Sequence, residues 1–372
     1  MKYYIIAGEA SGDLHGSRLI SEIRNNDPGA VFRVWGGDMM EQAGGHLVKH
    51  YRDLAFMGFL EVAVNLKTIL KNLNYCKKDI NDFRPDLLIL VDYPGFNLRM
   101  AKYASRKGFK VVYYISPQVW AWKKSRVYSI RKYVDKMLVI LPFEKAFYSK
   151  YQFDVDFVGH PLMDILNEAK DSGSRETFLK KNELHDMPVI ALLPGSRKQE
   201  IKRILPVMIR AAERYPGYQC VVAGAPSLDR EYYRSVTGDK DVRILFGQTH
   251  DLLRHSHAAL VASGTATLEA ALTGTPQVVC YRGSAISYAI ARRLVDVKYI
   301  SLVNLIMDRE VVTELIQNDL TADKLEAEMQ KIIQGPRRTE MISGYHSLRE
   351  RLGGPGAAAR AAAIIHQLLK RG

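Results

Sequence analysis

Short apolar runs, separated by helical patterns, limit this chain to a small set of folds. In the first part of the sequence the runs cover residues 3–7, 31–35, 87–91, 111–115 and 137–141. Helical periodicity lies between most of them, for instance over residues 14–24 and 98–107. Continuous β-branched strands that alternate with helices indicate a parallel sheet covered by helices on both faces.

The second half of the chain repeats this alternation. Its strand-like runs cover residues 189–193, 220–223, 242–246, 259–262 and 277–281, with helical patterns such as 198–215 and 265–272 between them. A chain of 372 residues is also too long for one ordinary core. We therefore predict an α/β protein with two doubly wound domains, residues 1–164 and 165–355, that face a central cleft. The alanine-rich helix 356–372 can pack back on the first domain.

The charge distribution points to a partner with phosphate groups. The net charge is +13, and residues 99–150 alone carry thirteen Lys and Arg against two acidic residues. Aromatic residues in this segment do not alternate with the basic ones, as platforms for stacked bases would. An anionic membrane surface therefore fits better than a nucleic acid, and a merely solvated basic face is the alternative.

A second membrane signal is an apolar stripe at helical spacing in residues 59–73, with Lys67 and Lys71 on another face. This helix is too short and too charged to cross a bilayer, but it could lie on one. Core packing is the usual alternative for such a stripe. The residues that we expect to face the membrane are Leu60, Val62, Leu66, Ile69 and Leu70.

The predicted compartment is the cytoplasm, with peripheral attachment to a membrane surface. The first residues turn polar too soon for a signal peptide, and no run approaches the roughly eighteen apolar residues of a membrane span. Cys76, Cys220 and Cys280 are far apart in the sequence, which suits a reducing compartment and argues against a zinc site. The sequence neither requires nor rules out a homodimer.

Two small-residue turns in the second half predict a nucleotide-diphosphate site. Pro194-Gly195-Ser196-Arg197 follows the run 189–193, and Ser263-Gly264-Thr265 follows 259–262; each turn opens a helix. Helix N-terminal amides and a guanidinium favour phosphate, and Glu269, one turn into its helix, could accept two ribose hydroxyls. Taken singly, each turn could be an ordinary glycine turn or N-cap. Their matching positions favour the ligand site.

Acidic residues follow two strands of the first half instead. Asp92 comes directly after the run 87–91, where it is either a general base or a turn-forming residue before Pro94-Gly95. The stretch AGEASGDLHG (7–16) lacks the glycine spacing of a dinucleotide site, and Glu9 and Asp13 would repel phosphate. We therefore expect the nucleotide to bind elsewhere, at the turns of the second half, and a different ligand to bind beside Glu9.

Neither a metal nor a cofactor is expected. Residues 154–156 and 239–241 each spell D-x-D, a pattern that elsewhere holds a metal on a nucleotide diphosphate, but neither follows a strand at the predicted cleft. Arg197 and the helix ends would neutralise the diphosphate instead.

Several stretches are specific in combination: AGEASGD (7–13), GGDMM (36–40), LAFMGFLEV (54–62), SPQVWAW (116–122), LPFEKAFY (141–148), LLPGSR (192–197), ASGTATLE (262–269) and SLVNLIMDREVVTELIQ (301–317). Together they resemble the lipid-A-disaccharide synthase family over nearly the whole chain. The resemblance implies the GT-B fold, with the nucleotide sugar on the C-terminal domain. It also implies metal-independent, inverting transfer of 2,3-diacylglucosamine from its UDP derivative to 2,3-diacylglucosamine 1-phosphate (lipid X), which gives a β-1,6 disaccharide 1-phosphate and UDP.

The resemblance also implies roles for single residues. Asp92 is the implied base, and Glu9 is a second acidic site on the acceptor side, where it would contact a sugar hydroxyl or orient Asp92. UDP-binding or catalytic positions fall on Arg197, Ser263, Gly264, Thr265, Glu269 and Asn304. The acylated substrates of the family also imply attachment to the inner membrane. Gly95 stands where the family often has a second carboxylate, which strengthens Asp92 as the candidate. The rival functions are a UDP-N-acetylglucosamine 2-epimerase-like isomerase, which shares the two-domain plan, and a non-catalytic lipid-binding relative.

Overall fold

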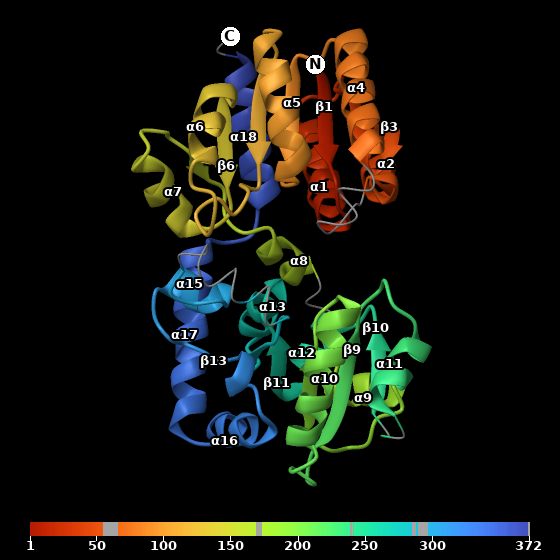
Figure 1. Ribbon diagram of the computed structural model, residues 1–372, viewed down its shortest axis with the longest axis vertical. Coiled ribbons are helices and arrows are strands. Elements are labelled where there is room, and N and C mark those ends of the chain that lie inside the picture. The colour runs from red at the N-terminus through yellow and green to blue at the C-terminus, as the bar shows by residue number, and fades with distance from the viewer. Residues whose placement is uncertain are drawn as a thin grey trace. The chain divides into compact units, whose positions relative to one another are not determined.

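The computed structural model describes residues 1–54, 66–168, 173–238, 240, 242–284, 288 and 297–370. The chain divides into two compact units (Figure 1). Unit 1 comprises Met1–Pro161 together with Gly354–Gly372, and unit 2 comprises Leu162–Gly353. Each unit is built on one parallel sheet with helices on its faces, so the predicted α/β class with two doubly wound sheets is confirmed.

The sheet of unit 1 has the strand order β3-β2-β1-β4-β5-β6-β7, and its strand pairs are parallel. Its strands are β1 (Lys2–Ala7), β2 (Val31–Gly36), β3 (Gly45–His50), β4 (Leu87–Val91), β5 (Lys110–Tyr114), β6 (Lys136–Val139) and β7 (Asp156–Phe157). The sequence analysis missed β3 and β7. Both are edge strands, where half-exposed polar residues replace the continuous apolar pattern of a central strand.

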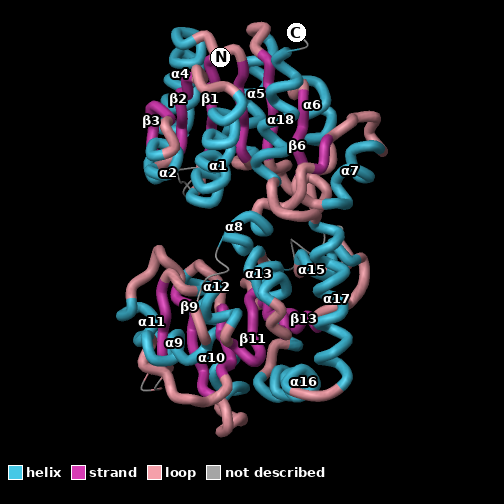
Figure 2. The backbone as a smooth tube through the Cα atoms, turned by 180° about the vertical axis from the view of Figure 1, so that it is seen from behind, coloured by secondary structure: helices cyan, strands magenta, loops and turns pink. Residues whose placement is uncertain are grey.

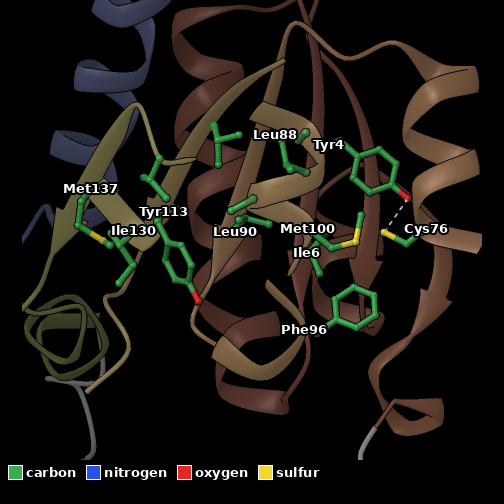
Figure 3. Close-up of a cluster of buried hydrophobic side chains, with 14 of the residues drawn as sticks. Tyr4, Ile6, Cys76, Leu88, Leu90, Phe96, Met100, Tyr113, Ile130 and Met137 are labelled. Atoms are coloured by element: carbon green, nitrogen blue, oxygen red, sulfur yellow. Dashed lines mark hydrogen bonds between the residues drawn. The ribbon is translucent and has the colours of Figure 1, made fainter. Parts of the chain in front are cut away.

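Helices cover both faces of this sheet. They are α1 (Ala10–Asn26), α2 (Asp38–Gln42), α4 (Leu66–Phe83), α5 (Pro94–Arg106), α6 (Arg126–Tyr133), α7 (Pro142–Ser149) and α18 (Ala357–Lys370), with a 3₁₀ turn at Tyr51–Asp53. Successive residues of β1 point to opposite faces. Tyr4 and Ile6 join the core beneath α4, α5 and α6 (Figure 3), whereas Tyr3, Ile5 and Ala7 join the core beneath α1 and α18. Figure 2 shows α1 and α18 in front of this sheet.

A buried polar cluster fixes α4 to the sheet. Asp79 of α4 accepts a hydrogen bond from the Tyr4 hydroxyl (2.6 Å) and forms an ion pair with Arg33 of β2 (2.6 Å). The same hydroxyl lies 3.9 Å from the sulfur of Cys76, as Figure 3 shows. The buried carboxylate meets both partners only when α4 lies in one position. The cluster therefore fixes where α4 packs along the sheet.

The C-terminal helix α18 completes unit 1. Ala361, Ala362 and Ile365 are buried in the core that α18 shares with α1, and small alanine side chains let the two helices approach closely. Arg360 also donates from Nε to the carbonyl of Val158 (2.8 Å), which follows β7. Residues from the two ends of the chain therefore share one core.

Unit 2 has a six-stranded sheet in the order β10-β9-β8-β11-β12-β13, again with parallel pairs. Its strands are β8 (Val189–Leu193), β9 (Gln219–Gly224), β10 (Arg243–Phe246), β11 (Ser256–Ala262), β12 (Gln277–Tyr281) and β13 (Thr313–Ile316). Its helices are α8 (Leu162–Glu168), α9 (Arg175–Lys181), α10 (Lys198–Ala212), α11 (Arg230–Thr237), α12 (Thr249–Arg254), α13 (Thr265–Thr273), α15 (Leu302–Met307), α16 (Ala322–Ile333) and α17 (Pro336–Leu352), with a 3₁₀ turn at Gln317–Asp319.

Each sheet has one point at which the strand order reverses. In unit 1 this point lies between β1 and β4, and in unit 2 between β8 and β11. The adjacent strands are in register to their ends, where Ala7 pairs with Val91 and Leu193 with Val261. Ligands of open α/β sheets bind beyond the carboxyl ends of the strands at such a reversal.

The first part of the predicted membrane helix 59–73, residues 59–65, falls outside the described residues. Leu60, Val62 and the side chain of Leu66 lie there, and α4 begins at Leu66. In the described part, Leu70 is 52% exposed, whereas Ile69 is half-buried and packs against the core beneath α4. For Ile69, the structure thus shows the core contact that the sequence left open. Among the described residues, the helices are all too short or too polar to cross a bilayer.

Candidate functional site

The first candidate site lies at the strand reversal of unit 1, where Asp92 follows β4. Asp92 and Tyr93 both have left-handed backbones, with φ of 43° and 49°. Two consecutive non-glycine residues in this region are strained and need support from their surroundings. The support comes from the backbone of Asp92: its amide donates to the carbonyl of Tyr114 (3.2 Å), and its carbonyl accepts from the Tyr113 hydroxyl (2.5 Å).

Asn97 of α5 ties this turn to the neighbouring strand. Its fully buried side-chain amide donates to the carbonyls of Asp92 (2.8 Å), Val91 (3.1 Å) and Ile6 (3.3 Å). Because Ile6 belongs to β1 and Val91 to β4, one side chain joins the ends of both strands. The asparagine of the Asp92–Asn97 stretch therefore holds the candidate base in place.

Electrostatics suit Asp92 to proton transfer. Burial raises its pKa to about 6, with a further contribution from the negative charge of Glu9. Glu9 follows β1 and stands at the N-cap of α1 without a side-chain capping bond. A carboxyl with a pKa near 6 is deprotonated at neutral pH and is a stronger base than an ordinary aspartate. The structure thus brings Glu9 and Asp92 to one site, as the sequence predicted.

Gly8 and Asp13 have structural roles in the AGEASGD stretch. A Cβ on Gly8 would overlap the ring of Tyr93, so the close approach of the two strand ends requires glycine there. The buried carboxylate of Asp13 accepts from the amides of Gly37 (2.7 Å), Met39 (3.2 Å) and Met40 (3.1 Å). Asp13 therefore caps the start of α2 and is occupied by its own chain.

A buried network orders the loop after β5, at the same sheet edge. The Ser116 hydroxyl lies 2.7 Å from that of Tyr148, and Glu144 accepts from the amides of Leu141 (2.9 Å) and Ile140 (3.2 Å). Burial raises the pKa of Glu144 to about 7. These residues lie in two stretches, 116–122 and 141–148, that carry the family resemblance but to which the sequence analysis gave no role.

The second candidate site is a cavity of about 370 Å³ at the strand reversal of unit 2. It is lined from both predicted turns: Gly195 and Ser196 follow β8, and Ser263, Gly264 and Thr265 follow β11. Gly195 and Gly264 have φ of 101° and 148°, which side chains rarely adopt. The two turns that were predicted to act together therefore do share one pocket.

Among the described residues, the charged side chains that line this pocket are acidic, and Arg197 is not one of the lining residues. Arg197 is the N-cap residue of α10 and its side chain is exposed. Glu269 of α13 lines the pocket and lies 3.7 Å from the Nε2 of His250 on α12. Glu200, which sequence reasoning did not select, also lines it, and a Cβ on Gly195 would overlap its carboxylate. A larger hollow of about 930 Å³ beside Gln219 and Arg243 lies at the opposite, amino edge of the sheet.

Asn304 is engaged entirely with its own chain. Its Nδ2 donates to the carbonyl of Val312 (2.8 Å) and to Glu314 (2.9 Å), and its Oδ1 accepts from the amides of Val311 (2.8 Å) and Val312 (3.0 Å). Both hydrogens and both lone pairs of the amide are thereby used. The side chain is also fully buried. This geometry is that of a residue that holds a loop, and a direct contact with nucleotide stays a prediction.

Comparison with known proteins gives one enzyme family over nearly the whole chain. The family model described as lipid-A-disaccharide synthetase matches residues 3–367. The lipid-A-disaccharide synthase of Syntrophus aciditrophicus is 44% identical over 99% of this chain and 97% of its own length. That of Myxococcus xanthus is 40% identical over the same shares.

Solved structures show the fold at much lower sequence identity. UDP-GlcNAc 2-epimerase from Neisseria meningitidis, solved with UDP-GlcNAc, superposes with a TM-score of 0.69 at 14% identity and full coverage of both chains. The calicheamicin glycosyltransferase CalG4 gives 0.62 at 17% identity, covering all of this chain and 98% of its own. The GT-B-type arrangement of two such sheets is thus shared by transferases and epimerases, and the fold alone does not separate them.

Proposed function

Because the chain belongs to the lipid-A-disaccharide synthetase family, we propose that its two sheet-edge sites bind the two substrates of a glycosyl transfer. The protein is a glycosyltransferase of lipid A biosynthesis, which condenses UDP-2,3-diacylglucosamine with lipid X. The epimerase alternative reduces to a likeness of fold, since it rests on structures of low identity alone.

The pocket of unit 2 is our candidate for the UDP part of the donor. The helices α10 and α13 start at its rim, and the first amides of a helix have no partners within it, so they favour phosphate oxygens. Arg197 at the start of α10 adds a permanent positive charge. The helix amides and the guanidinium neutralise the negative charge that develops on the leaving diphosphate. They therefore stabilise the transition state more than the bound substrate. Glu269 is the candidate for the ribose hydroxyls.

Asp92 is our candidate for the general base. In the proposed step Asp92 takes the proton of the acceptor 6-hydroxyl while that oxygen bonds to the anomeric carbon. The bond from that carbon to the diphosphate oxygen breaks on the opposite face, so UDP leaves and the anomeric configuration inverts. The observation that carries this assignment is the position of Asp92, directly after β4 at the point where the strand order of unit 1 reverses. Glu9 would tune the pKa of Asp92 or hold a sugar hydroxyl.

The deciding experiment measures UDP release with both diacylglucosamine substrates, with and without a chelator. We expect release only when both lipids are present and at the same rate with chelator, since Arg197 and the helix ends would replace a metal. Conversion of UDP-N-acetylglucosamine alone would support the epimerase instead. Binding of both lipids without UDP release would indicate a non-catalytic relative.

We also propose that unit 1 attaches to the anionic inner-membrane surface where acylated substrates reside. The segment before and within α6 supports this. Trp122 is 40% and Tyr128 63% exposed, and Lys123 and Arg126 lie 4.7 and 5.2 Å from the Trp122 ring. Exposed aromatics beside cations are typical of membrane-interface residues, because ring and charge suit the acyl boundary and the head groups respectively. Leu70 on α4 is a further exposed apolar residue of the same unit.

A further inference from the structure

One carboxylate on the edge strand of unit 2 holds the whole start of α15. Glu314 lies in β13, opposite Val279 of β12. Its Oε2 accepts from the amide of Ile300 (2.9 Å), and its Oε1 accepts from the amide and hydroxyl of Ser301 (3.0 and 2.7 Å) and from Nδ2 of Asn304 (2.9 Å). A carboxylate offers about four lone-pair positions, so these bonds use its full capacity.

The bonds of Glu314 reach the nucleotide pocket through a single peptide group. The amide of Ser301 and the carbonyl of Ile300 belong to the same rigid, planar unit. Glu314 binds that unit at its amide end, and the hydroxyl of Ser263 donates to its carbonyl end (2.9 Å). Ser263 lines the pocket at the end of β11. Rotating the peptide at one end therefore moves the hydrogen-bond acceptor of Ser263 at the other.

Ser263 is better suited to placing its turn than to donating to a ligand. Its hydroxyl hydrogen is already given to Ile300, and its backbone amide donates to the carbonyl of Cys280 (3.0 Å). Gly264 and Thr265 follow directly and begin α13, whose first amides border the pocket. Whatever fixes Ser263 thus fixes the direction of those amides.

We propose that Glu314 is a positioning residue of the donor pocket, which sets the Ser263-Gly264-Thr265 turn through the Ile300–Ser301 peptide. This inference rests on the proposed function, because the ligand concerned is the UDP part of the donor. Asn304 supports the same segment, since it bonds Glu314 on one side and the amides of Val311 and Val312 on the other.

The test is the affinity of the full chain for UDP, measured by titration calorimetry. Glu314→Gln keeps the shape of the side chain but turns one acceptor oxygen into a donor that faces N–H or O–H donors. We expect UDP to bind ten- to a hundredfold more weakly, as an order of magnitude for one lost and one conflicting hydrogen bond. Glu310→Gln is the matched control, because Glu310 is an exposed glutamate on the same segment, near Arg337 (3.7 Å).

A double-mutant cycle with Ser263→Ala separates positioning from general loosening. If Glu314 acts through the Ser263 hydroxyl, Glu314→Gln weakens UDP binding much less in the Ser263→Ala background than in the wild type. An equal loss in both backgrounds would overturn the inference, as would a Glu314→Gln protein that binds UDP like the wild type. A wild-type chain that binds no UDP would refute the proposed function itself.

A milder variant covers the case in which Glu314→Gln melts below the assay temperature. Ser301→Ala removes one of the four bonds to the same carboxylate, and we expect a smaller loss of UDP affinity with the same dependence on Ser263. If Ser301→Ala folds and keeps the wild-type affinity for UDP, the positioning role is wrong.

Discussion

At the scale of single residues, Asp92 is the group on which catalysis should depend most. Asp92→Asn keeps the shape of the side chain but removes the base, so we expect kcat to fall by roughly 10²–10⁴. Affinity for UDP should stay unchanged, because the nucleotide pocket lies in unit 2. Asp82→Asn, at an exposed position on α4, is the control. Near-normal UDP release by Asp92→Asn would exclude Asp92 as the base.

The pairing of Asp92 with Glu9 predicts a pH dependence. The base must be deprotonated to accept a proton, so kcat/KM should rise as the pH passes through about 6, the pKa of Asp92. Glu9→Gln removes a negative charge that raises this pKa. The rise should therefore move to lower pH in this variant, in a pH profile of UDP release. A midpoint that does not move would show that Glu9 does not act on Asp92.

The sequence pointed to these two acids because each lies within two residues of the end of a strand, and the ends of adjacent parallel strands meet. Hydrogen-bond partners that are distant in the chain could not be predicted from the sequence. Asp13 accepts hydrogen bonds from the amides of Gly37 and Met40, which only the packing of α2 brings near. Likewise, Glu314 reads as an ordinary polar residue of an edge strand until its four donors are seen together.

At the scale of elements, the segment leading into α6 carries the two exposed rings that we propose for attachment to a membrane surface. Replacing Trp122 by Ala and Tyr128 by Ser should weaken binding to vesicles that contain anionic lipid, because both exposed rings and the platform for Lys123 and Arg126 are lost. Co-sedimentation with vesicles measures this.

Met39→Ser is the control for this experiment, since Met39 is another exposed apolar residue of unit 1, on α2. It should leave vesicle binding unchanged. Equal binding by the wild type and by the Trp122 and Tyr128 double variant would contradict the surface that we assign. Binding to zwitterionic vesicles as tight as to anionic ones would argue against a role for the lysines and arginines.

Central elements were predicted better than edge elements, for a physical reason. Strands such as β4 and β8 are buried on both faces and match the predicted residues 87–91 and 189–193. The edge strands β3 and β13 mix apolar and polar residues, so their composition resembles that of a loop. The apolar stripe around Ile69 was ambiguous because a core and a membrane both select the same side chains.

At the scale of the whole molecule, the return of α18 to unit 1 is testable with two neighbouring alanines. Ala362 is buried against α1, and Ala363 is exposed on the same helix. Ala362→Asp should lower the free energy of unfolding of unit 1 by about 3 kcal/mol, since it buries an unpaired charge. Ala363→Asp shares only the helix-propensity cost of roughly 0.5 kcal/mol.

Chemical denaturation, followed by a probe in unit 1, compares these two variants. Equal destabilisation would mean that α18 does not contribute to the core. The sequence made this helix recognisable through its alanines and suggested that it packs back on the first domain, but not which residues it contacts, because the contact joins residues near opposite ends of the chain. Arg360, which donates to the carbonyl of Val158, is a further contact between distant parts of the chain, and no local sequence pattern predicts it.

The packing of α18 on unit 1 also limits the order in which the protein can fold during synthesis. Unit 1 begins before unit 2 in the chain, yet the helix that closes one of its faces is translated only after unit 2. Until then Leu19 and Ile20 lack part of their cover, whereas every strand of unit 2 has already emerged. Domains usually fold in the order of their synthesis. Here unit 1 can be completed only after unit 2 has emerged, so a fragment that ends before α18 would expose apolar surface and be prone to aggregate.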